Sequence, residues 1–322
     1  MNYRGILREI ASDLAYVETE LEKHALTSNT LLRDTSDHLL KAGGKRLRPA
    51  LVLLAGKFFN YLLERLGPLA VAIELIHMAT LVHDDIIDGA STRRGIPTVR
   101  AQWGDPVALY TGSYLLAQAL TLVAEHGNAQ VARVLADVSL KMCEGEIEQI
   151  ETIGKLDQGM RAYLRRIKLK TALLISSCCL IGALASDAPP AVARSLKKYG
   201  YYIGMAFQIS DDILDLVGSE KQCGKPVGSD LRQGIITLPV IYALKDRTWG
   251  SRLAQIILTE NKEESEWEEI FWLVKVSGAL NSSQNLCNLY LAKAKQQLMV
   301  LPDLPPRRIL AAMADFVGSR DF

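Results

Sequence analysis

Apolar residues recur at helical spacing along most of this chain, which favours helices over strands. No proline occurs between Pro106 and Pro189, so that segment can hold several uninterrupted helices. Alternating strand patterns of Val, Ile and Thr joined by Asn-Gly turns are absent from the sequence. The pattern therefore predicts an all-α fold. Helix breaks are expected where Gly, Pro and Asn gather, at residues 42–44, 67–68, 89–97, 104–106, 126–128, 187–190 and 218–234.

The composition is that of a helical enzyme with a large core. Apolar residues make up 49% of the chain, mean hydropathy is +0.10 and net charge is +1, which gives no general argument for nucleic acid or an anionic membrane. The five cysteines lack Cys-x-x-Cys spacing and are interpreted as reduced thiols. The longest apolar run, residues 172–185, is too short to cross a bilayer, and the N-terminus lacks a signal-peptide core. We therefore expect a cytoplasmic protein with no transmembrane segment.

One acidic pattern occurs twice within apolar, helix-compatible stretches, as Asp84-Asp85-Ile86-Ile87-Asp88 and Asp211-Asp212-Ile213-Leu214-Asp215. Residues four apart share a helix face, so the first and last aspartates of each copy would point the same way. Paired carboxylates in apolar surroundings repel each other and need cations. Mg²⁺ fits best, because it accepts a few carboxylates and completes its shell with water and substrate phosphates. Two motifs that cooperate must meet around one ligand, so we expect residues 1–322 to form a single domain.

Basic residues follow each acidic pattern. Arg93 and Arg94 come soon after Asp88, and Lys225 follows Asp215 across a loop. A ligand with its own negative charge could bridge a metal on the acidic helix and a cation on the loop. A diphosphate is such a ligand, so the arrangement indicates diphosphate binding.

Upstream, two glycines and three cations stand at a predicted loop-to-helix junction, Gly43-Gly44-Lys45-Arg46-Leu47-Arg48-Pro49. Backbone N–H groups and side chains can converge on phosphate at such a junction. A solvated helix start is an equally good interpretation of this segment taken alone.

Three further side chains share a face or a boundary with the apolar, acidic stretches. His77 precedes Asp84 by two helical turns, which favours a ligand contact over a core position. Gln208 lies three residues before Asp211 and shares its face. Lys170 stands where an apolar run begins, so it is the member of its basic cluster most able to reach inward. The glutamates of the segment between these helices are interpreted as a solvated face: Glu144, Glu146 and Glu148.

Six blocks resemble the trans-polyprenyl diphosphate synthases in order and spacing, residues 43–49, 82–88, 93–95, 170–171, 207–215 and 224–226. They cover nearly the whole chain, whereas a single Asp-Asp-x-x-Asp pattern would carry little weight. Residues 163–174 and 316–322 look most like the subfamily of two-component heptaprenyl synthases, in which a catalytic component II works with a small component I.

The resemblance implies an isoprenoid synthase fold, with antiparallel helices around a deep central cavity. It implies condensation of an allylic diphosphate, such as farnesyl diphosphate, with isopentenyl diphosphate to give a long product, with heptaprenyl diphosphate for menaquinone synthesis as the expected one. A small component I or a second copy of the chain would be the protein partner. Three Mg²⁺ ions per site are implied, with the ligands Asp84, Asp85, Asp88, Asp211 and Asp215.

The resemblance also assigns substrate contacts and catalytic roles. The allylic diphosphate would be bound by Arg93, Lys170, Thr171, Gln208 and Lys225. Isopentenyl diphosphate would be bound by Gly44, Lys45, Arg48, His77 and Arg94. The residues expected to be catalytic are Asp84, Asp88, Asp211 and Lys170.

Product length is predicted from residues just before the first acidic pattern. The growing tail should pass Ala79, Thr80 and Ile76, none of which is aromatic. In the family that this chain resembles, bulky residues there stop growth early. The small pair therefore implies a long product, which Ala79→Tyr or Ala79→Phe should shorten.

Two positions depart from the pattern of the family, and two rivals stay open. Ser113 stands where many members have Asp, and the segment after Gly234 lacks a Lys that would contact diphosphate. A class I terpene cyclase shares metal-triggered ionisation, but its second motif usually contains Asn or Asp, Ser or Thr, and Glu. A non-catalytic prenyl-binding subunit should have lost aspartates or arginines, which this chain retains.

Overall fold

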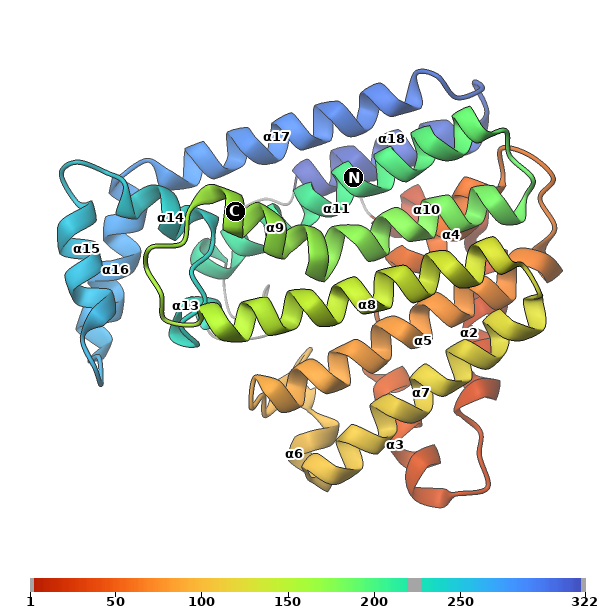
Figure 1. Ribbon diagram of the computed structural model, residues 1–322, viewed down its shortest axis with the longest axis horizontal. Helices are drawn as coiled ribbons and strands as arrows, with labels where there is room; N and C mark the ends of the chain where they lie inside the picture. Colours follow the sequence, from red (N-terminus) through yellow and green to blue (C-terminus); the bar gives the residue numbers. More distant parts are fainter. Residues whose placement is uncertain (1–2, 219–226, 320–322) are drawn as a thin grey trace.

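The computed structural model describes residues 3–218 and 227–319, and it confirms the all-α prediction. Long helices run across the molecule in roughly the same direction (Figure 1). The α-helices are α1 (Tyr3–Ile6), α2 (Ala11–Ala25), α3 (Thr30–Lys41), α4 (Leu47–Gly56), α5 (Leu63–Ile87), α6 (Val99–Trp103), α7 (Asp105–His126), α8 (Ala129–Thr152), α9 (Met160–Ile167), α10 (Leu173–Ala185), α11 (Pro190–Val217), α13 (Ser229–Arg232), α14 (Leu238–Leu244), α15 (Gly250–Leu258), α16 (Glu264–Val276), α17 (Ala279–Leu298) and α18 (Pro305–Gly318). A 3₁₀ turn occupies Arg8–Ile10, and a π-helical turn at Lys168–Ala172 joins α9 to α10.

The two acidic patterns lie near the C-terminal ends of the two most buried long helices, α5 and α11. Helix α5 packs along α7 and also contacts α4, while α11 packs between α10 and α17. Apolar residues surround α5 on all sides, which is typical of a helix inside a core rather than on a surface. Packing fixes both acidic helices from several directions, so the carboxylates at their ends stand on rigid supports.

Most predicted helix breaks agree with the structure, and the exception at residues 67–68 has a physical reason. Of the break predicted at 218–234, residues 219–226 lie outside the described residues, and the short helix α13 falls within the rest. Residues 67–68 lie inside α5 because Pro68 falls in the second turn of a long buried helix, where packing outweighs one lost backbone hydrogen bond. Residues 89–97 form a small antiparallel hairpin of β1 (Thr92–Arg93) and β2 (Ile96–Pro97). Its turn residues Arg94 and Gly95 have φ of 54° and 80°, as a tight two-residue hairpin turn requires.

Three helices are long and apolar enough to cross a membrane by length and composition alone, so the estimate that no apolar stretch reaches membrane length was wrong, while the absence of a transmembrane segment stays a prediction. They are Leu63–Ile87, Asp105–His126 and Met160–Ala185. The prediction failed because it counted uninterrupted apolar runs, whereas helices that contain a few polar residues reach this length. Within the structure 72%, 39% and 72% of their apolar windows are buried, so two of them serve as core helices and α7 remains largely uncovered.

Helices α7 and α8 carry rows of apolar residues on their outer faces. Leu109, Tyr110 and Leu120 of α7 are at least half exposed, and α8 exposes Leu140 and Ile147 to a similar degree. The residues on α8 are seven apart and therefore share one face, opposite the buried face that contains Met142. An apolar stripe on each side of one helix is unusual for a surface helix and indicates a covering partner.

Candidate active site

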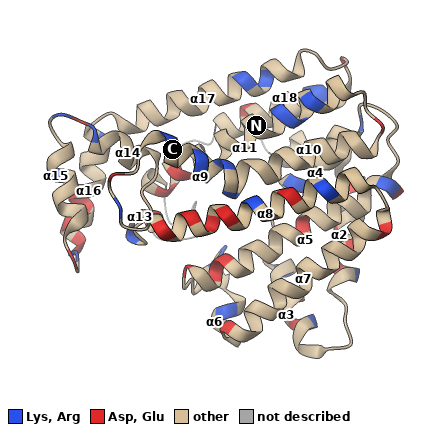
Figure 2. Cartoon of the chain, viewed as in Figure 1, with Lys and Arg blue, Asp and Glu red and all other residues tan. Residues whose placement is uncertain are grey.

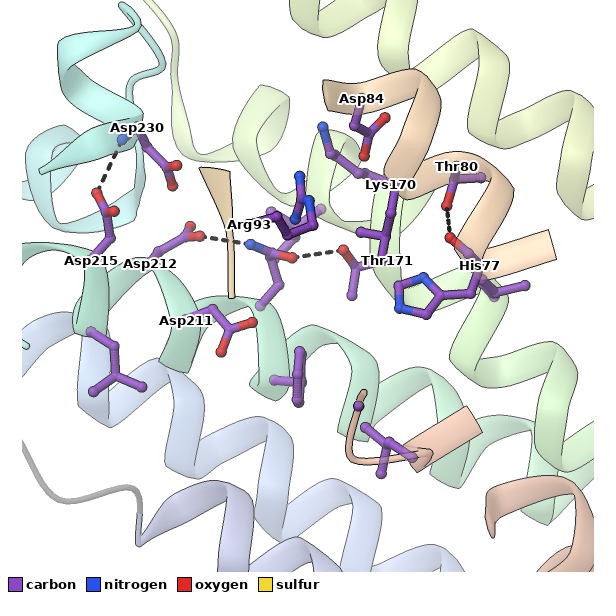
Figure 3. A pocket seen from close by; sticks show the side chains of 18 of the residues that line it. His77, Thr80, Asp84, Arg93, Lys170, Thr171, Asp211, Asp212, Asp215 and Asp230 are labelled. Carbon is purple, nitrogen blue, oxygen red and sulfur yellow. Dashed lines mark hydrogen bonds between the residues drawn. The ribbon is translucent and has the colours of Figure 1, made fainter. Parts of the chain in front are cut away.

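A cavity of about 1040 Å³ lies between the C-terminal halves of α5 and α11. The N-terminus of α4, the β1–β2 hairpin, the π-helical turn, the α13 segment and α18 complete its wall. Figure 3 shows Asp84 on one side and Asp211, Asp212 and Asp215 on the other, with Lys170 and Arg93 between them. Segments far apart in the chain thus place acidic and basic side chains around one space.

The first acidic pattern presents two of its three aspartates to the cavity. Asp84 and Asp88 line it, together with Thr80 and His77 on the same face of α5. Asp85 lies about 100° around the helix from Asp84, is 2% exposed and is absent from the cavity wall. Its Oδ1 accepts hydrogen bonds from Arg93, at 2.8 Å from Nε and 2.7 Å from Nη2. Asp85 thus holds the hairpin cation in place at a distance from the cavity wall, and its role as a metal ligand stays a prediction.

The second acidic pattern differs from the first, because all three of its aspartates line the cavity. Asp211 and Asp215 line the cavity, and the Oδ2 of Asp215 accepts a hydrogen bond from the backbone N–H of Asp230 at 3.2 Å. The carboxyl of Asp212 is bound by the hydroxyl of Tyr163 at 2.7 Å and by the amide of Gln208 at 2.9 Å.

Gln208 connects the second motif to the π-helical turn. Its amide oxygen accepts a hydrogen bond from the hydroxyl of Thr171 at 2.6 Å, so Thr171, Gln208 and Asp212 form one chain of hydrogen bonds (Figure 3). Single π-helical turns of this kind often mark functional sites. Both predicted diphosphate ligands, Thr171 and Gln208, line the cavity.

Burial controls the ionisation of the carboxyls at this site. Burial raises the pKa of Asp84 to about 7, because the neighbouring charge of Lys170 offsets only part of the desolvation cost and Glu146 and Asp88 add to it. Burial also raises the pKa of Asp212 to about 7, with help from Asp230. These carboxyls favour a bound cation, which would replace the proton that burial otherwise retains.

Glu146 is closer to the cavity than the sequence indicated. Its carboxylate accepts hydrogen bonds from Lys170, with Nζ–O distances of 2.9 and 3.1 Å, so the interpretation of Glu146 as part of a solvated face was wrong. Burial alone would lower the pKa of Lys170, but Asp84 and Glu146 together raise it, so the ammonium stays charged. The acidic residues of α8 gather toward its C-terminal end, next to this basic turn (Figure 2).

A second group of cations surrounds the N-terminus of α4, where Gly44, Lys45, Arg48, His77 and Arg94 all line the cavity. Burial lowers the pKa of His77 well below its usual value, and the nearby Arg48 and Arg94 lower it further, so His77 is neutral. A Cβ on Gly44 would stand 3.1 Å from a terminal nitrogen of Arg94, so glycine allows this cation to approach the backbone. The excess of positive charge suits an anionic ligand.

Arg46 belongs to this segment but binds protein carboxylates. It is 8% exposed and pairs with Glu18 of α2 and with Glu74 of α5, at 3.1 Å for the latter. Its backbone is left-handed, with φ of 49°, which places the guanidinium back between the two helices. Glu74, itself 3% exposed, thus joins α5 to the loop that contains Gly44.

Most of the residues predicted as ligands line the cavity, and their roles as ligands stay predictions. Lys225 lies outside the described residues. Ser113 is exposed on α7 and its hydroxyl binds the carbonyl of Leu109, so this departure lies away from the cavity. At the other departure the apolar Ile235 lines the wall. Cavity residues that the sequence analysis missed include Arg166, Gln149, Asp230 and Phe316, which lack a short motif of their own.

Among the residues that the structure describes, no three His, Cys, Asp or Glu side chains converge closely enough to form a ready-made metal cluster. The aspartates instead face each other in pairs across the cavity, close to cations. Such a donor set fits hard divalent cations that take their remaining oxygen ligands from water and from a bound phosphate group.

Comparison with known proteins defines the class. The family model described as polyprenyl synthetase matches residues 29–274, and the chain belongs to this family. Its relatives are named as prenyl or polyprenyl diphosphate synthases, so the chain is a prenyltransferase with the isoprenoid synthase fold. Because the chain belongs to the polyprenyl synthetase family, the alternative that it is a class I terpene cyclase loses its support.

Individual relatives and solved structures that resemble the chain include heptaprenyl diphosphate synthases. The chain is 46% identical to heptaprenyl diphosphate synthase component 2 of Geobacillus stearothermophilus, over 100% of both chains. The crystal structure of heptaprenyl diphosphate synthase from Staphylococcus aureus matches with a TM-score of 0.91 and 37% identity, covering 100% of this chain and 99% of that one. A polyprenyl synthase from Caulobacter crescentus, complexed with calcium and isoprenyl diphosphate, matches with a TM-score of 0.95 and 31% identity over 99% and 98% of the two chains.

Proposed function

We propose that this chain is the catalytic subunit of a long-chain all-trans polyprenyl diphosphate synthase, with heptaprenyl diphosphate as its product. The observation that carries the proposal is the pair of carboxylate sets on α5 and α11, which line one cavity whose wall also contains several cations and apolar side chains. The name of the Geobacillus relative supports the particular product. We propose that the chain forms one domain, since residues from both ends of the described chain line the same cavity. A cytoplasmic location stays a prediction.

Mg²⁺ is the metal we propose, held by Asp84, Asp88, Asp211 and Asp215, and three ions per site remain our prediction. The calcium in the Caulobacter structure supports a divalent cation in this family. When bound, the metal neutralises charge that develops on the departing diphosphate.

The cationic side chains perform the electrostatic part of the reaction. Lys170 and Arg93 would bind the allylic diphosphate as its C–O bond breaks and the electron pair leaves with the diphosphate. Arg48 and Arg94 would hold isopentenyl diphosphate so that its double bond meets the allylic cation and forms the new carbon–carbon bond. Loss of a proton to the released diphosphate would complete one cycle.

Apolar residues below the charged region would protect the cation and receive the tail. Thr80 and Leu81 of α5, Met142 of α8 and Leu174 of α10 line this part of the cavity. They exclude water that would otherwise quench the cation. Ala79 is 1% exposed and does not line the cavity, whereas the neighbouring Thr80 does, so we propose that Thr80 contacts the growing chain.

The apolar rows on α7 and α8 are the surface we propose for the protein partner. The Geobacillus relative is named a component 2, which implies a second component. Leu120 of α7 and Leu140 of α8 are 56% and 66% exposed, which is costly for a free subunit in water. A small component I is the partner we favour, with a second copy of this chain as the alternative, and menaquinone side-chain supply is the pathway we propose.

A direct assay tests this function. Purified chain with Mg²⁺, farnesyl diphosphate and labelled isopentenyl diphosphate, with and without a candidate component I, should yield a heptaprenyl product once the partner is added. Chromatography of the labelled product reads its length. Absence of any prenyl product under both conditions would contradict the proposal, and a shorter or longer product would correct only its length.

A further inference from the structure

A buried arginine in the cavity wall has no role in the reaction as described so far. Arg166 lies on α9, one helical turn before Lys170, and is 7% exposed. Its Nη1 donates to the side-chain oxygen of Gln158 at 2.8 Å, and its Nη2 donates to the backbone carbonyl of Ile236 at 2.5 Å. The side chain lines the same cavity as Lys170.

No carboxylate neutralises this cation within residues 3–218 and 227–319. Both hydrogen-bond partners of Arg166 are neutral, and no ion pair joins it to a described carboxylate. Asp212 feels its charge, but hydrogen bonds from Tyr163 and Gln208 already hold that carboxyl. Toward the described residues, the guanidinium uses two of its five N–H donors. A buried cation that lacks an anionic partner is costly unless an anion reaches it.

The adjacent Arg165 shows the contrast. Its side chain is 58% exposed and pairs with Glu148 at 2.6 Å on the outside of the bundle. Arg165 is absent from the cavity wall. Two neighbouring arginines therefore differ in direction, because consecutive residues lie about 100° apart around a helix.

The loop that Arg166 contacts contributes no positive charge of its own to the cavity. This loop, residues 233–237, places the apolar Ile235 in the wall, directly before the carbonyl that binds Arg166. Its backbone is also fixed to the end of α8, since the N–H of Gly154 donates to the carbonyl of Gly234. Arg166 is thus held at the place in the wall where the loop lacks a cation.

We propose that Arg166 is an additional ligand of the allylic diphosphate, which it binds on the side of the second acidic motif. The inference rests on the proposed function, because that function supplies the anion. Gln158 and the carbonyl of Ile236 orient the guanidinium and leave its other donors for phosphate oxygens. In this role Arg166 supplies the charge that Ile235 cannot.

Pyrophosphate binding in the presence of Mg²⁺ tests the proposal by calorimetry. Arg166→Gln keeps a polar side chain near Ile236 but removes the charge, and it should weaken pyrophosphate binding at least tenfold. It should raise KM for farnesyl diphosphate, because a contact to that substrate is lost. KM for isopentenyl diphosphate should stay within about twofold of the value for the unaltered protein, because no contact to that substrate is lost. Arg166→Lys keeps the positive charge, so its affinity for pyrophosphate should fall much less. Arg165→Gln is the matched control and should bind pyrophosphate like the unaltered protein.

Two further variants separate charge from loop anchoring. Adding Ile235→Lys to Arg166→Gln returns a cation to the same wall and should restore much of the lost pyrophosphate affinity. Gln158→Leu removes an anchoring hydrogen bond but keeps the cation, so affinity should stay within about twofold. Normal affinity in folded Arg166→Gln, equal losses in Arg166→Gln and Arg166→Lys, or a tenfold loss in Gln158→Leu would each overturn the proposal.

The same experiments distinguish this inference from the proposed function. A wild-type chain that makes no prenyl product with or without a partner refutes the function. A wild-type chain that is active, together with an Arg166→Gln variant that binds pyrophosphate normally, refutes only the role of Arg166. Circular dichroism shows whether Arg166→Gln folds. If it does not, the pyrophosphate affinities of Arg166→Lys and Gln158→Leu still show whether binding depends on the positive charge of Arg166 or on the hydrogen bonds that hold its side chain in place.

Discussion

The two acidic motifs have nearly the same sequence, yet the protein holds them by different means. In both, the first and last aspartates line the cavity. In α5 the middle residue, Asp85, is tied to a cation, Arg93. In α11 the middle residue, Asp212, is tied to the neutral groups of Tyr163 and Gln208. We infer that the middle aspartate of each motif holds its helix end in position. A cationic partner such as Arg93 neutralises the negative charge of that aspartate, whereas neutral partners leave the charge in place near the substrate.

The residues one turn before each motif also differ. Thr80 precedes Asp84 and Phe207 precedes Asp211, and both residues line the cavity. Because threonine is much smaller than phenylalanine, we expect the growing hydrocarbon chain to pass along α5 rather than along α11. The comparison divides the cavity into a side for the tail and a side that supports the reacting groups.

The outer aspartates should be indispensable in both motifs. Asp84→Ala and Asp211→Ala should each lower turnover by roughly a hundredfold or more, the scale of losing one preorganised electrostatic partner. Steady-state assays with saturating Mg²⁺ measure this, with circular dichroism to show that each variant is folded. Near-normal turnover in either variant would contradict the expectation that both motifs are required for the reaction.

Product length should respond to the α5 side. Thr80→Phe places an aromatic ring one turn below Asp84 and should shift the main product to shorter chains, as read by chromatography. Ala79→Phe, the change that the sequence suggested, enlarges a side chain that is 1% exposed and should chiefly lower stability. Unchanged product length in Thr80→Phe would show that the tail takes another route.

The middle aspartates should differ in their effect on stability. Asp85→Asn leaves Arg93 without its anion and should cost on the order of 1.5–3 kcal/mol, as for a hydrogen bond to a charged group. Asp212→Asn can keep bonds to neutral partners and should cost about 1 kcal/mol or less. Urea unfolding at pH 8 measures both free energies, and equal costs would contradict the distinction drawn between the motifs.

Acidity should weaken metal binding through Asp84. Its pKa of about 7 exceeds that of an unfolded aspartate, so the metal-free folded state binds more protons between about pH 4 and pH 7 and loses stability as pH rises through that window. Below pH 7 Mg²⁺ must displace a proton, so apparent affinity should fall by up to about tenfold per pH unit for one proton. Calorimetric titration with Mg²⁺ and pyrophosphate at pH 6, 7 and 8 measures this, and a flat profile would contradict it.

Residue spacing was enough to place the carboxylate pairs, because a helix puts positions four apart on one face whatever surrounds it. The same rule assigned His77 to the cavity. It could not decide which of Arg165 and Arg166 turns inward, since neither belongs to a motif and the choice depends on how α9 packs. Glu146 was misplaced for a related reason: its partner, Lys170, reaches it through the packing of the π-helical turn against α8. Contacts between distant segments are absent from any local pattern.

The uncovered apolar rows of α7 and α8 have a practical consequence for anyone who measures this enzyme. If a partner subunit covers those rows, the amount of assembled, active enzyme and the rate at which it forms depend on the protein concentration. Specific activity should then decline on dilution and recover on concentration, and rates compared between laboratories will agree only at matched subunit content.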